Sequence, residues 1–185
     1  MIAKLVDKYL SDKNASGYSK TYEKLFENLR YNTMNILEIG IGTLEGGKSN
    51  MLRWKEKKEN YQPGASLKVW KEYFENSQIY GIDVKEDCMI SESRIKTFLC
   101  DSTSDESVGK LPDLNFDIII DDGLHSFEAQ NKTFKLFYPK LKKGGLYFIE
   151  DVRDYKKFFN VENELNRQNL LINKNDIGNL LWIKK

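Results

Sequence analysis

Four acidic residues follow two apolar runs of the sequence, each at the point where a strand would end. Asp121 and Asp122 close the run FDIIIDD, and Glu150 and Asp151 close the run LYFIED. Neighbouring strands of an open sheet end at one edge, so these four carboxylates are expected in one crevice, where they repel one another. A hard divalent cation relieves that repulsion, and Mg²⁺ takes oxygen ligands while keeping positions for water or substrate. The sequence therefore predicts a Mg²⁺ site at these strand ends.

The only histidine of the chain, His125, lies just beyond Asp122 on the turn that leaves the same strand. A single histidine is commonly an ordinary surface residue, and that interpretation stays open. An imidazole beside a cation can also take the proton of a hydroxyl whose acidity the cation has raised. The position of His125 favours this second interpretation, a general base.

Other apolar runs also end in acids or glycines. Glu38, Gly40 and Gly42 lie in LEIGIG, Asp83 ends YGIDV, and Asp101 lies in LCDSTS. The glycines let a cofactor approach the backbone closely, Asp83 suits ribose hydroxyls, and Asp101 suits the amino group of adenine. Each acid alone could be a helix N-cap. The series, with one acid for each strand end, indicates a cofactor that contains a nucleoside.

The stretch GTLEGGKS, residues 42–49, matches the phosphate-binding pattern G-x-x-x-x-G-K-[ST] and offers ATP binding as an alternative. A phosphate loop requires a helix that begins at the Ser and packs on the sheet. The following residues lose their apolar positions after Trp54, so such a helix would pack poorly. We therefore expect residues 43–65 to form a long loop with Lys48 in a flap, followed by a helix with Ser66 as its N-cap.

The elements that must position these residues alternate along the chain. Short apolar runs without strict alternation are typical of strands buried on both faces, and the helical patterns between them predict an α/β fold with a doubly wound parallel sheet. The end of the chain, NLLINKNDIGNLLWIKK, predicts an antiparallel hairpin. Ahead of the first strand, Tyr18, Tyr22, Leu25 and Phe26 recur at helical spacing and predict a helical lead-in that covers the sheet or the cofactor.

The composition limits the kinds of partner. The 185 residues suit one domain, and 29 Lys and Arg against 28 Asp and Glu give no field that would attract a nucleic acid. In the first residues, MIAKLVDKYLSDK, charged residues interrupt the apolar ones, which predicts neither a signal peptide nor a membrane span. We expect a soluble, cytoplasmic protein without a membrane partner, and nothing in the pattern decides between a monomer and a homo-oligomer.

Taken together, these motifs resemble class I S-adenosylmethionine-dependent methyltransferases. More narrowly, they resemble the macrocin O-methyltransferase and cephalosporin-hydroxylase-like group and the related methyltransferases of surface-polysaccharide synthesis. The matching stretches are LEIGIGT, PGASLKVWKEYFENSQIYGIDV, RIKTFLCD, FDIIIDDGLHS and LKKGGLYFIEDV, over about residues 35–152. The lead-in SDKNASGYSKTYEKLF also matches, although Ser16 stands where relatives often carry His.

The resemblance implies a Rossmann-like sandwich with a seven-stranded sheet in the order 3-2-1-4-5-7-6, strand 7 being antiparallel. It also implies S-adenosylmethionine and Mg²⁺ as cofactors and a sugar hydroxyl, in a glycan or a glycosylated metabolite, as the methyl acceptor. The predicted site residues are, for the metal, Asp122, Glu150 and Asp151; for the cofactor, Glu38, Gly40, Gly42, Asp83, Asp101, Ser102 and Asp121; and for proton removal, His125. A phosphate-loop NTPase or kinase and a cofactor-binding module without activity remain as alternatives.

Overall fold

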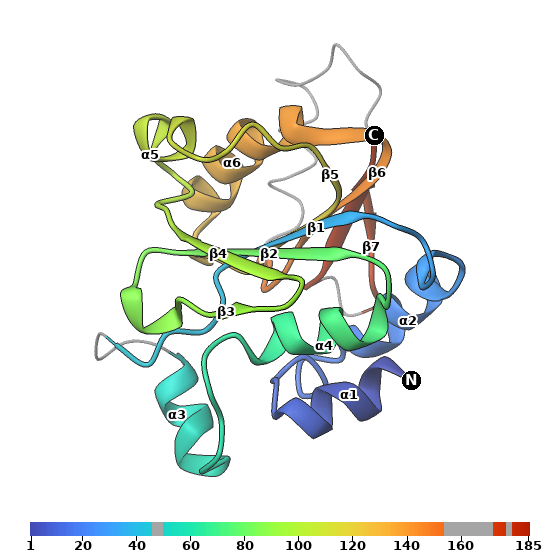
Figure 1. The fold of residues 1–185 in the computed structure, drawn as a ribbon, viewed down its shortest axis with the longest axis vertical. Coiled ribbons are helices and arrows are strands. Elements are labelled where there is room, and N and C mark those ends of the chain that lie inside the picture. The colour runs from blue at the N-terminus through green and yellow to red at the C-terminus, as the bar shows by residue number, and fades with distance from the viewer. Residues whose placement is uncertain (46–49, 154–171, 177–178) are drawn as a thin grey trace.

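A computed structural model describes residues 1–45, 50–153, 172–176 and 179–185 of the protein. An eight-stranded sheet in the order β3-β4-β2-β1-β5-β6-β8-β7 runs through the centre of the molecule (Figure 1). The strands are β1 (Asn35–Ile39), β2 (Gln78–Asp83), β3 (Ser91–Glu92), β4 (Ile95–Leu99), β5 (Phe116–Asp121), β6 (Leu141–Ile149), β7 (Ile172–Lys174) and β8 (Leu181–Lys184). β4, β2, β1, β5 and β6 are parallel, whereas β8 pairs antiparallel with both β6 and β7.

The predicted strand order is confirmed, together with the antiparallel strand and the closing hairpin, but the predicted count of seven strands was wrong. The additional strand is β3, which pairs antiparallel with the outer edge of β4. Thr97 of β4 explains the pairing, because its Oγ1 bonds to the backbone N and O of Ile90 at 2.9 and 2.8 Å. A strand of only two residues is too short to produce a periodic pattern that sequence analysis could detect.

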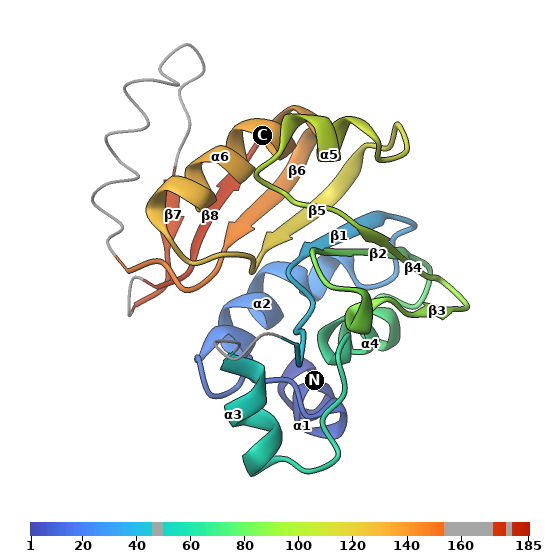
Figure 2. The same cartoon turned by 90° about the vertical axis from the view of Figure 1, so that its left-hand side faces the viewer.

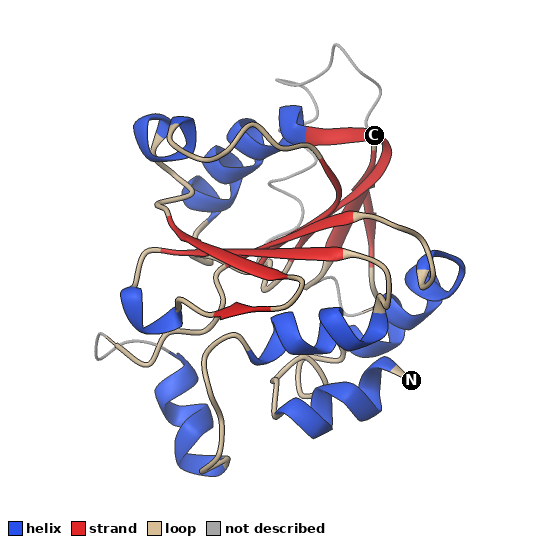
Figure 3. Cartoon of the chain, in the orientation of Figure 1, coloured by secondary structure: helices blue, strands red, loops and turns tan. Residues whose placement is uncertain are grey.

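The α-helices of the described residues form one layer on each face of the sheet, except α3, which lies outside both layers. They are α1 (Ile2–Tyr9), α2 (Tyr18–Phe26), α3 (Asn50–Lys57), α4 (Ala65–Tyr73), α5 (Asp105–Gly109) and α6 (Phe127–Phe137). Helices α1, α2 and α4 cover one face, and α5 and α6 cover the other (Figures 2 and 3). None of the helices in the described part of the chain combines the length and the apolar character that a membrane span requires.

The central strands are buried on both faces, which explains their continuous apolar runs. Ile36 of β1 packs toward α1, α2 and α4, whereas the next residue, Leu37, packs toward α5 and α6. The predicted helical lead-in is confirmed as α1 and α2. Tyr22 of α2 lies edge-on to Trp70 of α4, with ring centroids 5.3 Å apart, and edge-on to Phe148 of β6 at 5.0 Å. The lead-in is therefore part of the core beneath the sheet.

Residues 43–65 are not wholly a loop, because α3 lies within them. The helix stands outside the two layers that cover the sheet (Figure 2), and its Trp54 donates from Nε1 to the carbonyl of Leu10 in the lead-in at 2.6 Å. A helix that follows a phosphate loop instead packs on the sheet. The placement of α3 therefore does not support the phosphate-loop alternative, and Lys48 lies outside the described residues.

The predicted N-cap of α4 was also wrong. Ser66 is inside the helix, and Gly64 is the N-cap, with a left-handed φ of 75°. The amide of Gly64 donates to the carbonyl of Ile41 at 2.8 Å, which ties the start of α4 to the loop after β1. A left-handed backbone favours glycine over the serine that capping preferences alone would select.

Candidate active site

Three acids that end or nearly end the central strands face the lead-in. Side chains alternate along a strand, so residues two positions apart point to the same face. The residues two positions before Glu38, Asp122 and Glu150 lie in the apolar core beneath α1, α2 and α4: Ile36, Ile120 and Phe148. The three carboxylates are therefore brought to one side of the sheet, whereas Asp121 points to the side of α5 and α6.

Lys13, from the segment between α1 and α2, occupies the space between these three carboxylates. Its Nζ lies 3.0 Å from Glu38 Oε1 and 3.1 Å from Asp122 Oδ2. The same Nζ donates to both carboxylate oxygens of Glu150 at 2.8 Å. The lysine side chain is only 2% exposed. Burial opposes its charge, but the fields of the three carboxylates together raise the pKa of Lys13 well above its usual range.

Neutral groups also donate hydrogen bonds to two of these acids. Trp70 donates from Nε1 to Glu38 Oε2 at 2.9 Å, and the hydroxyl of Tyr22 donates to Glu150. Glu38 is completely buried by these partners. The structure thus places its carboxylate inside the protein, held by Lys13 and Trp70, although the sequence predicted it to bind the cofactor.

The cluster is short of positive charge, since one ammonium faces three carboxylates. Burial raises the pKa of Asp122 well above its ordinary value, and the charge of Glu150 adds to the shift. Burial likewise raises the pKa of Glu150 to about 7, aided by Glu38 and opposed by Lys13. Such shifts indicate that a further cation near these groups would be stabilised.

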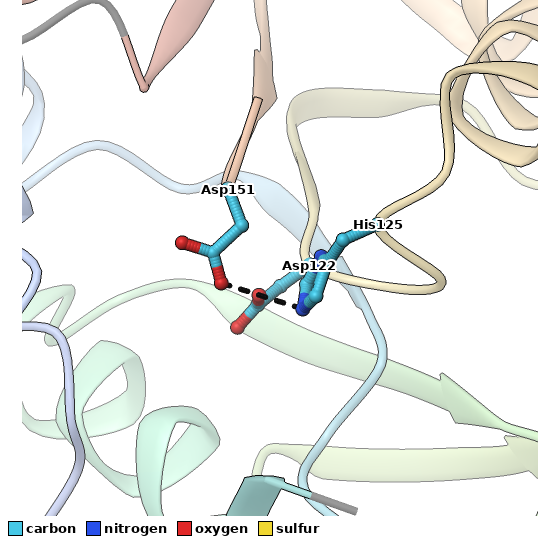
Figure 4. Close-up of side chains that lie close together, drawn as sticks. All are labelled: Asp122, His125 and Asp151. Atoms are coloured by element: carbon cyan, nitrogen blue, oxygen red, sulfur yellow. Dashed lines mark ion pairs between the residues drawn. The ribbon is translucent and has the colours of Figure 1, made fainter. Parts of the chain in front are cut away.

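A second cluster lies on the open side of Asp122. Asp122, His125 and Asp151 each offer one ligand atom, and these atoms lie within 4.8 Å of one another (Figure 4). His125 Nε2 is 3.3 Å from Asp151 Oδ2. The three side chains are 22%, 23% and 41% exposed, so a substrate can approach them. Oxygen and imidazole ligands at this spacing suit a divalent cation.

His125 is poised to be neutral near pH 7. Burial lowers its pKa below the ordinary value of 6.5, and the attraction of Asp151 only partly opposes this shift. Its Nδ1 is buried without a hydrogen-bond partner in the structure. A neutral imidazole that is 23% exposed can accept a proton or bind a metal.

The metal ligands predicted from the sequence are only partly gathered in this cluster. Asp122 and Asp151 belong to it, and His125, predicted as the base, is the third member. Glu150 directs its carboxylate to Lys13 and Tyr22 instead. It adjoins the cluster through Lys13, whose ammonium contacts both Glu150 and Asp122.

The loop after β1 and the end of β2 form a rigid edge beside these clusters. Gly40 and Gly42 have φ angles of 80° and 89°, and a Cβ on Gly40 would lie 2.2 Å from the backbone O of Asp122. Asp83 is tied to this loop, because its Oδ2 accepts from the amide of Ile41 at 2.9 Å. The predicted cofactor residues Gly40, Gly42 and Asp83 therefore lie together.

Two further predicted cofactor residues meet on the opposite face of the sheet. A Cβ on Gly123 would lie 3.3 Å from Asp121 Oδ1 and 3.9 Å from Ser102 Oγ, so Asp121 and Ser102 flank this glycine. Asp121 is 1% exposed, its Oδ2 has no hydrogen-bond partner in the structure, and burial raises its pKa to about 7. Asp101 is exposed, and its Oδ1 accepts from the amide and hydroxyl of Thr103.

Comparisons with known proteins identify relatives of this chain, although no protein-family model matches it. It is 32% identical over 152 residues to the demethylmacrocin O-methyltransferase of Streptomyces fradiae, covering 80% of this chain and 35% of that protein. It is 30% identical over 155 residues to the 8-demethyl-8-alpha-L-rhamnosyl tetracenomycin-C 2'-O-methyltransferase of Streptomyces olivaceus, covering 82% and 38%. The chain is a homologue of the macrocin-type sugar O-methyltransferases.

The fold agrees with this relationship. The MycE methyltransferase, solved in complex with Mg, S-adenosylhomocysteine and mycinamycin VI, superposes with a TM-score of 0.76 at 24% identity, covering 99% of this chain and 54% of that one. The chain thus has the class I methyltransferase fold predicted from its motifs. It spans about a third of the length of the macrocin-type relatives, at 35% and 38%.

Lys13 is the functional candidate that sequence reasoning missed in this macrocin-type homologue. The repulsion among the strand-end acids predicts a cation between them, and the sequence motifs assign that position to a metal alone. The available signal was the lead-in SDKNASGYSKTYEKLF, which matched the family and contains Lys13. A buried position for that lysine has no local pattern, because two of its three acidic partners, Asp122 and Glu150, lie 109 and 137 residues away in the sequence.

Proposed function

We propose that the protein is a Mg²⁺-dependent O-methyltransferase that uses S-adenosylmethionine and acts on a sugar hydroxyl of a glycosylated small molecule. The cluster of Asp122, His125 and Asp151, at the carboxyl ends of β5 and β6, carries the proposal. It combines candidate metal ligands with a neutral imidazole, beside an edge suited to a nucleoside. The names of the relatives, which act on sugar hydroxyls of antibiotic glycosides, support the acceptor class.

The residues present fit a divalent cation. Asp122 and Asp151 supply oxygens, and the raised pKa of Asp122 shows that one ammonium leaves this carboxylate under-compensated. Glu150, whose carboxylate contacts Lys13 and Tyr22 beside this cluster, is the third acidic ligand that we propose. When bound, the cation would acidify a coordinated sugar hydroxyl. MycE, which shares the fold, was solved with Mg.

His125 would remove the proton of that hydroxyl. Its Nε2 faces the crevice, and its lowered pKa keeps the imidazole neutral and able to accept a proton near pH 7. Asp151 Oδ2, 3.3 Å from Nε2, would stabilise the imidazolium that forms. The proton thus moves from the sugar oxygen to His125 Nε2, which can then donate it in a hydrogen bond to Asp151 Oδ2.

The cofactor would lie along the edge formed by the loop after β1. Gly40 and Gly42 have the left-handed backbone of this edge, and Asp83, held by the amide of Ile41, would supply carboxylate oxygens for the ribose hydroxyls. Asp121 and Ser102 would bind the cofactor from the other face. We also propose that residues 1–185 act as one methyltransferase domain, since the lead-in shares its core with the sheet.

Calorimetric titrations of the protein with S-adenosylhomocysteine and with ATP, run in parallel, test the cofactor assignment. We expect the first to bind and the second not to. Methyl transfer from S-adenosylmethionine to mycinamycin VI is then followed with chelator and with Mg²⁺ restored, and we expect activity only with Mg²⁺. ATP binding without S-adenosylhomocysteine binding would refute the assignment, and full turnover in chelator would remove the metal from the mechanism.

A matched pair of variants locates the metal site. Asp122→Asn should abolish Mg²⁺ binding and turnover while sparing S-adenosylhomocysteine binding, because its carboxylate is assigned to the metal and not to the cofactor. Asp105→Asn is the control, since Asp105 is an exposed acid of α5 whose side chain is 78% exposed. Equal Mg²⁺ affinity in the two variants would place the metal elsewhere.

A further inference from the structure

The lead-in contacts each of the acids that the proposed function assigns to the metal. Lys13 bonds to Asp122 and Glu150. The hydroxyl of Tyr18, at the start of α2, donates to Asp151 Oδ1 at 2.6 Å and accepts from the backbone amide of Asp151 at 3.0 Å. Tyr18 is 1% exposed, so water does not readily replace these two bonds.

Asp151 needs such support because of its backbone. Its φ of 51° lies in the left-handed region, which residues other than glycine rarely adopt. A conformation of this kind persists where the surroundings hold it in place. The Tyr18 hydroxyl contacts both the amide and one carboxylate oxygen of Asp151, and thereby fixes the backbone and the side chain together.

The two oxygens of Asp151 consequently have different partners. Oδ1 accepts from Tyr18, whereas Oδ2 is directed toward His125 Nε2, 3.3 Å away, and toward Asp122 (Figure 4). Without the Tyr18 hydroxyl, Oδ1 would lose its donor and the carboxylate could rotate away from the imidazole. The direction of Oδ2 therefore depends on a residue that itself lies outside the cluster.

We propose that Tyr18 is a positioning residue of the active site, which holds Asp151 so that one oxygen remains available to the metal and to His125. This inference rests on the proposed function. In this proposal the lead-in positions an active-site residue in addition to packing against the sheet. Partners of metal ligands that act in this way commonly change metal affinity or activity 10–100-fold when they are removed.

Tyr18→Phe tests the proposal, because it removes the hydroxyl and keeps the buried ring. We expect a fall of about 10–100-fold in Mg²⁺ affinity or in kcat. The affinity is measured by calorimetry with the metal alone. The affinity for S-adenosylhomocysteine should not change. Tyr9→Phe is the matched control, because Tyr9 of α1 also donates its hydroxyl to a carboxylate, that of Glu72, outside the crevice. The control should keep the Mg²⁺ affinity and kcat of the wild type.

His125 provides an independent readout, since it is the only histidine in the chain and gives one set of imidazole signals in histidine-labelled protein. At one fixed alkaline pH, Tyr18→Phe should shift these signals, and Tyr9→Phe should not. Unchanged signals together with unchanged Mg²⁺ affinity in Tyr18→Phe would overturn the positioning role, even if the variant were less stable. A wild-type protein that neither binds Mg²⁺ nor transfers methyl groups would instead refute the proposed function, and the imidazole signals would still decide whether Tyr18 orients Asp151.

Discussion

Lys13→Met removes the buried cation of the acidic cluster while keeping most of the side-chain volume. The ammonium lies within 3.1 Å of oxygens from Glu38, Asp122 and Glu150, and the lysine is 2% exposed. Removing one partner from a buried ion pair costs about 3–5 kcal/mol, because the other charges stay buried and uncompensated. Domains of this kind are stable by only about 5–15 kcal/mol. Lys13→Met should therefore lower the free energy of unfolding by about a fifth of the total or more.

The pH dependence of this loss identifies its electrostatic origin. Lys13 stays charged throughout the range because its pKa is raised well above normal, whereas the pKa of Glu150 is already raised to about 7. In the variant, these carboxyls can take up protons as the pH falls, and a neutral carboxyl needs no counter-charge. The difference between wild type and Lys13→Met should thus be largest at about pH 8 and should shrink by about pH 5.

Urea denaturation at both pH values, monitored by tryptophan fluorescence, measures this difference. Adding Glu38→Gln to Lys13→Met should recover part of the stability, because Glu38 is one of the anions left without a partner. Lys8→Met should have no measurable effect, since Lys8 pairs with Glu72 at the surface and is 54% exposed. A loss below about 1 kcal/mol that is equal at both pH values would refute the argument that Lys13 compensates buried charge.

Three further outcomes follow from the proposed roles. His125→Ala should lower kcat by about 10²–10⁴. The wild-type kcat/KM should rise with pH through an ionisation below 6.5 that this variant lacks, because burial lowers the pKa of His125 and the base must be neutral. Asp83→Ala should weaken S-adenosylhomocysteine binding by about 1.5–3 kcal/mol in a calorimetric titration, the worth of hydrogen bonds to a charged group. Burial raises the pKa of Asp121 from the ordinary value of 3.8 to about 7. The buried carboxylate therefore destabilises the folded protein increasingly as the pH rises from 3.8 to about 7. Asp121→Asn should accordingly raise the free energy of unfolding by about 2–4 kcal/mol at pH 8 and by little near pH 4, measured by urea denaturation.

The fold was predictable because its signals are local or belong to whole motifs. Apolar runs such as FDIIID mark strands buried on both faces, and the resemblance supplied their order, which β1 to β8 confirm apart from β3. The errors concern elements whose patterns are weak. The apolar residues of α3 stop at Trp54, and this short helix lies against the lead-in, where a broad apolar face is not needed.

The strand-end acids were predictable as a group. The sequence also indicates which face of the sheet each acid lies on, and the predicted site did not take this into account. The period of two along a strand already separates Asp121 from Asp122, and it places Glu38 on the face of Ile36. This alternation places the Glu38 side chain on the face of the sheet that α1, α2 and α4 cover. The contacts of Lys13 with Asp122 and of Tyr18 with Asp151 are different, because they join residues that lie 109 and 133 positions apart in the sequence. Local patterns do not encode such pairs.

The position of Lys13 also bears on how such a site can exist before a metal binds. Two buried carboxylates, Glu38 and Glu150, beside the half-buried Asp122 would lose protons only at a large cost in folding free energy if no fixed cation were present. Lys13 supplies a permanent positive charge that is part of the chain, so the strand ends can assemble in the absence of metal. Burial and the charge of Glu150 raise the pKa of Asp122 although Lys13 opposes the shift, so a second cation beside Asp122 would be stabilised. Lys13 thus supplies the positive charge that the acids need for folding, which must always be present. The metal, in our proposal, supplies the exchangeable positive charge that catalysis needs beside His125.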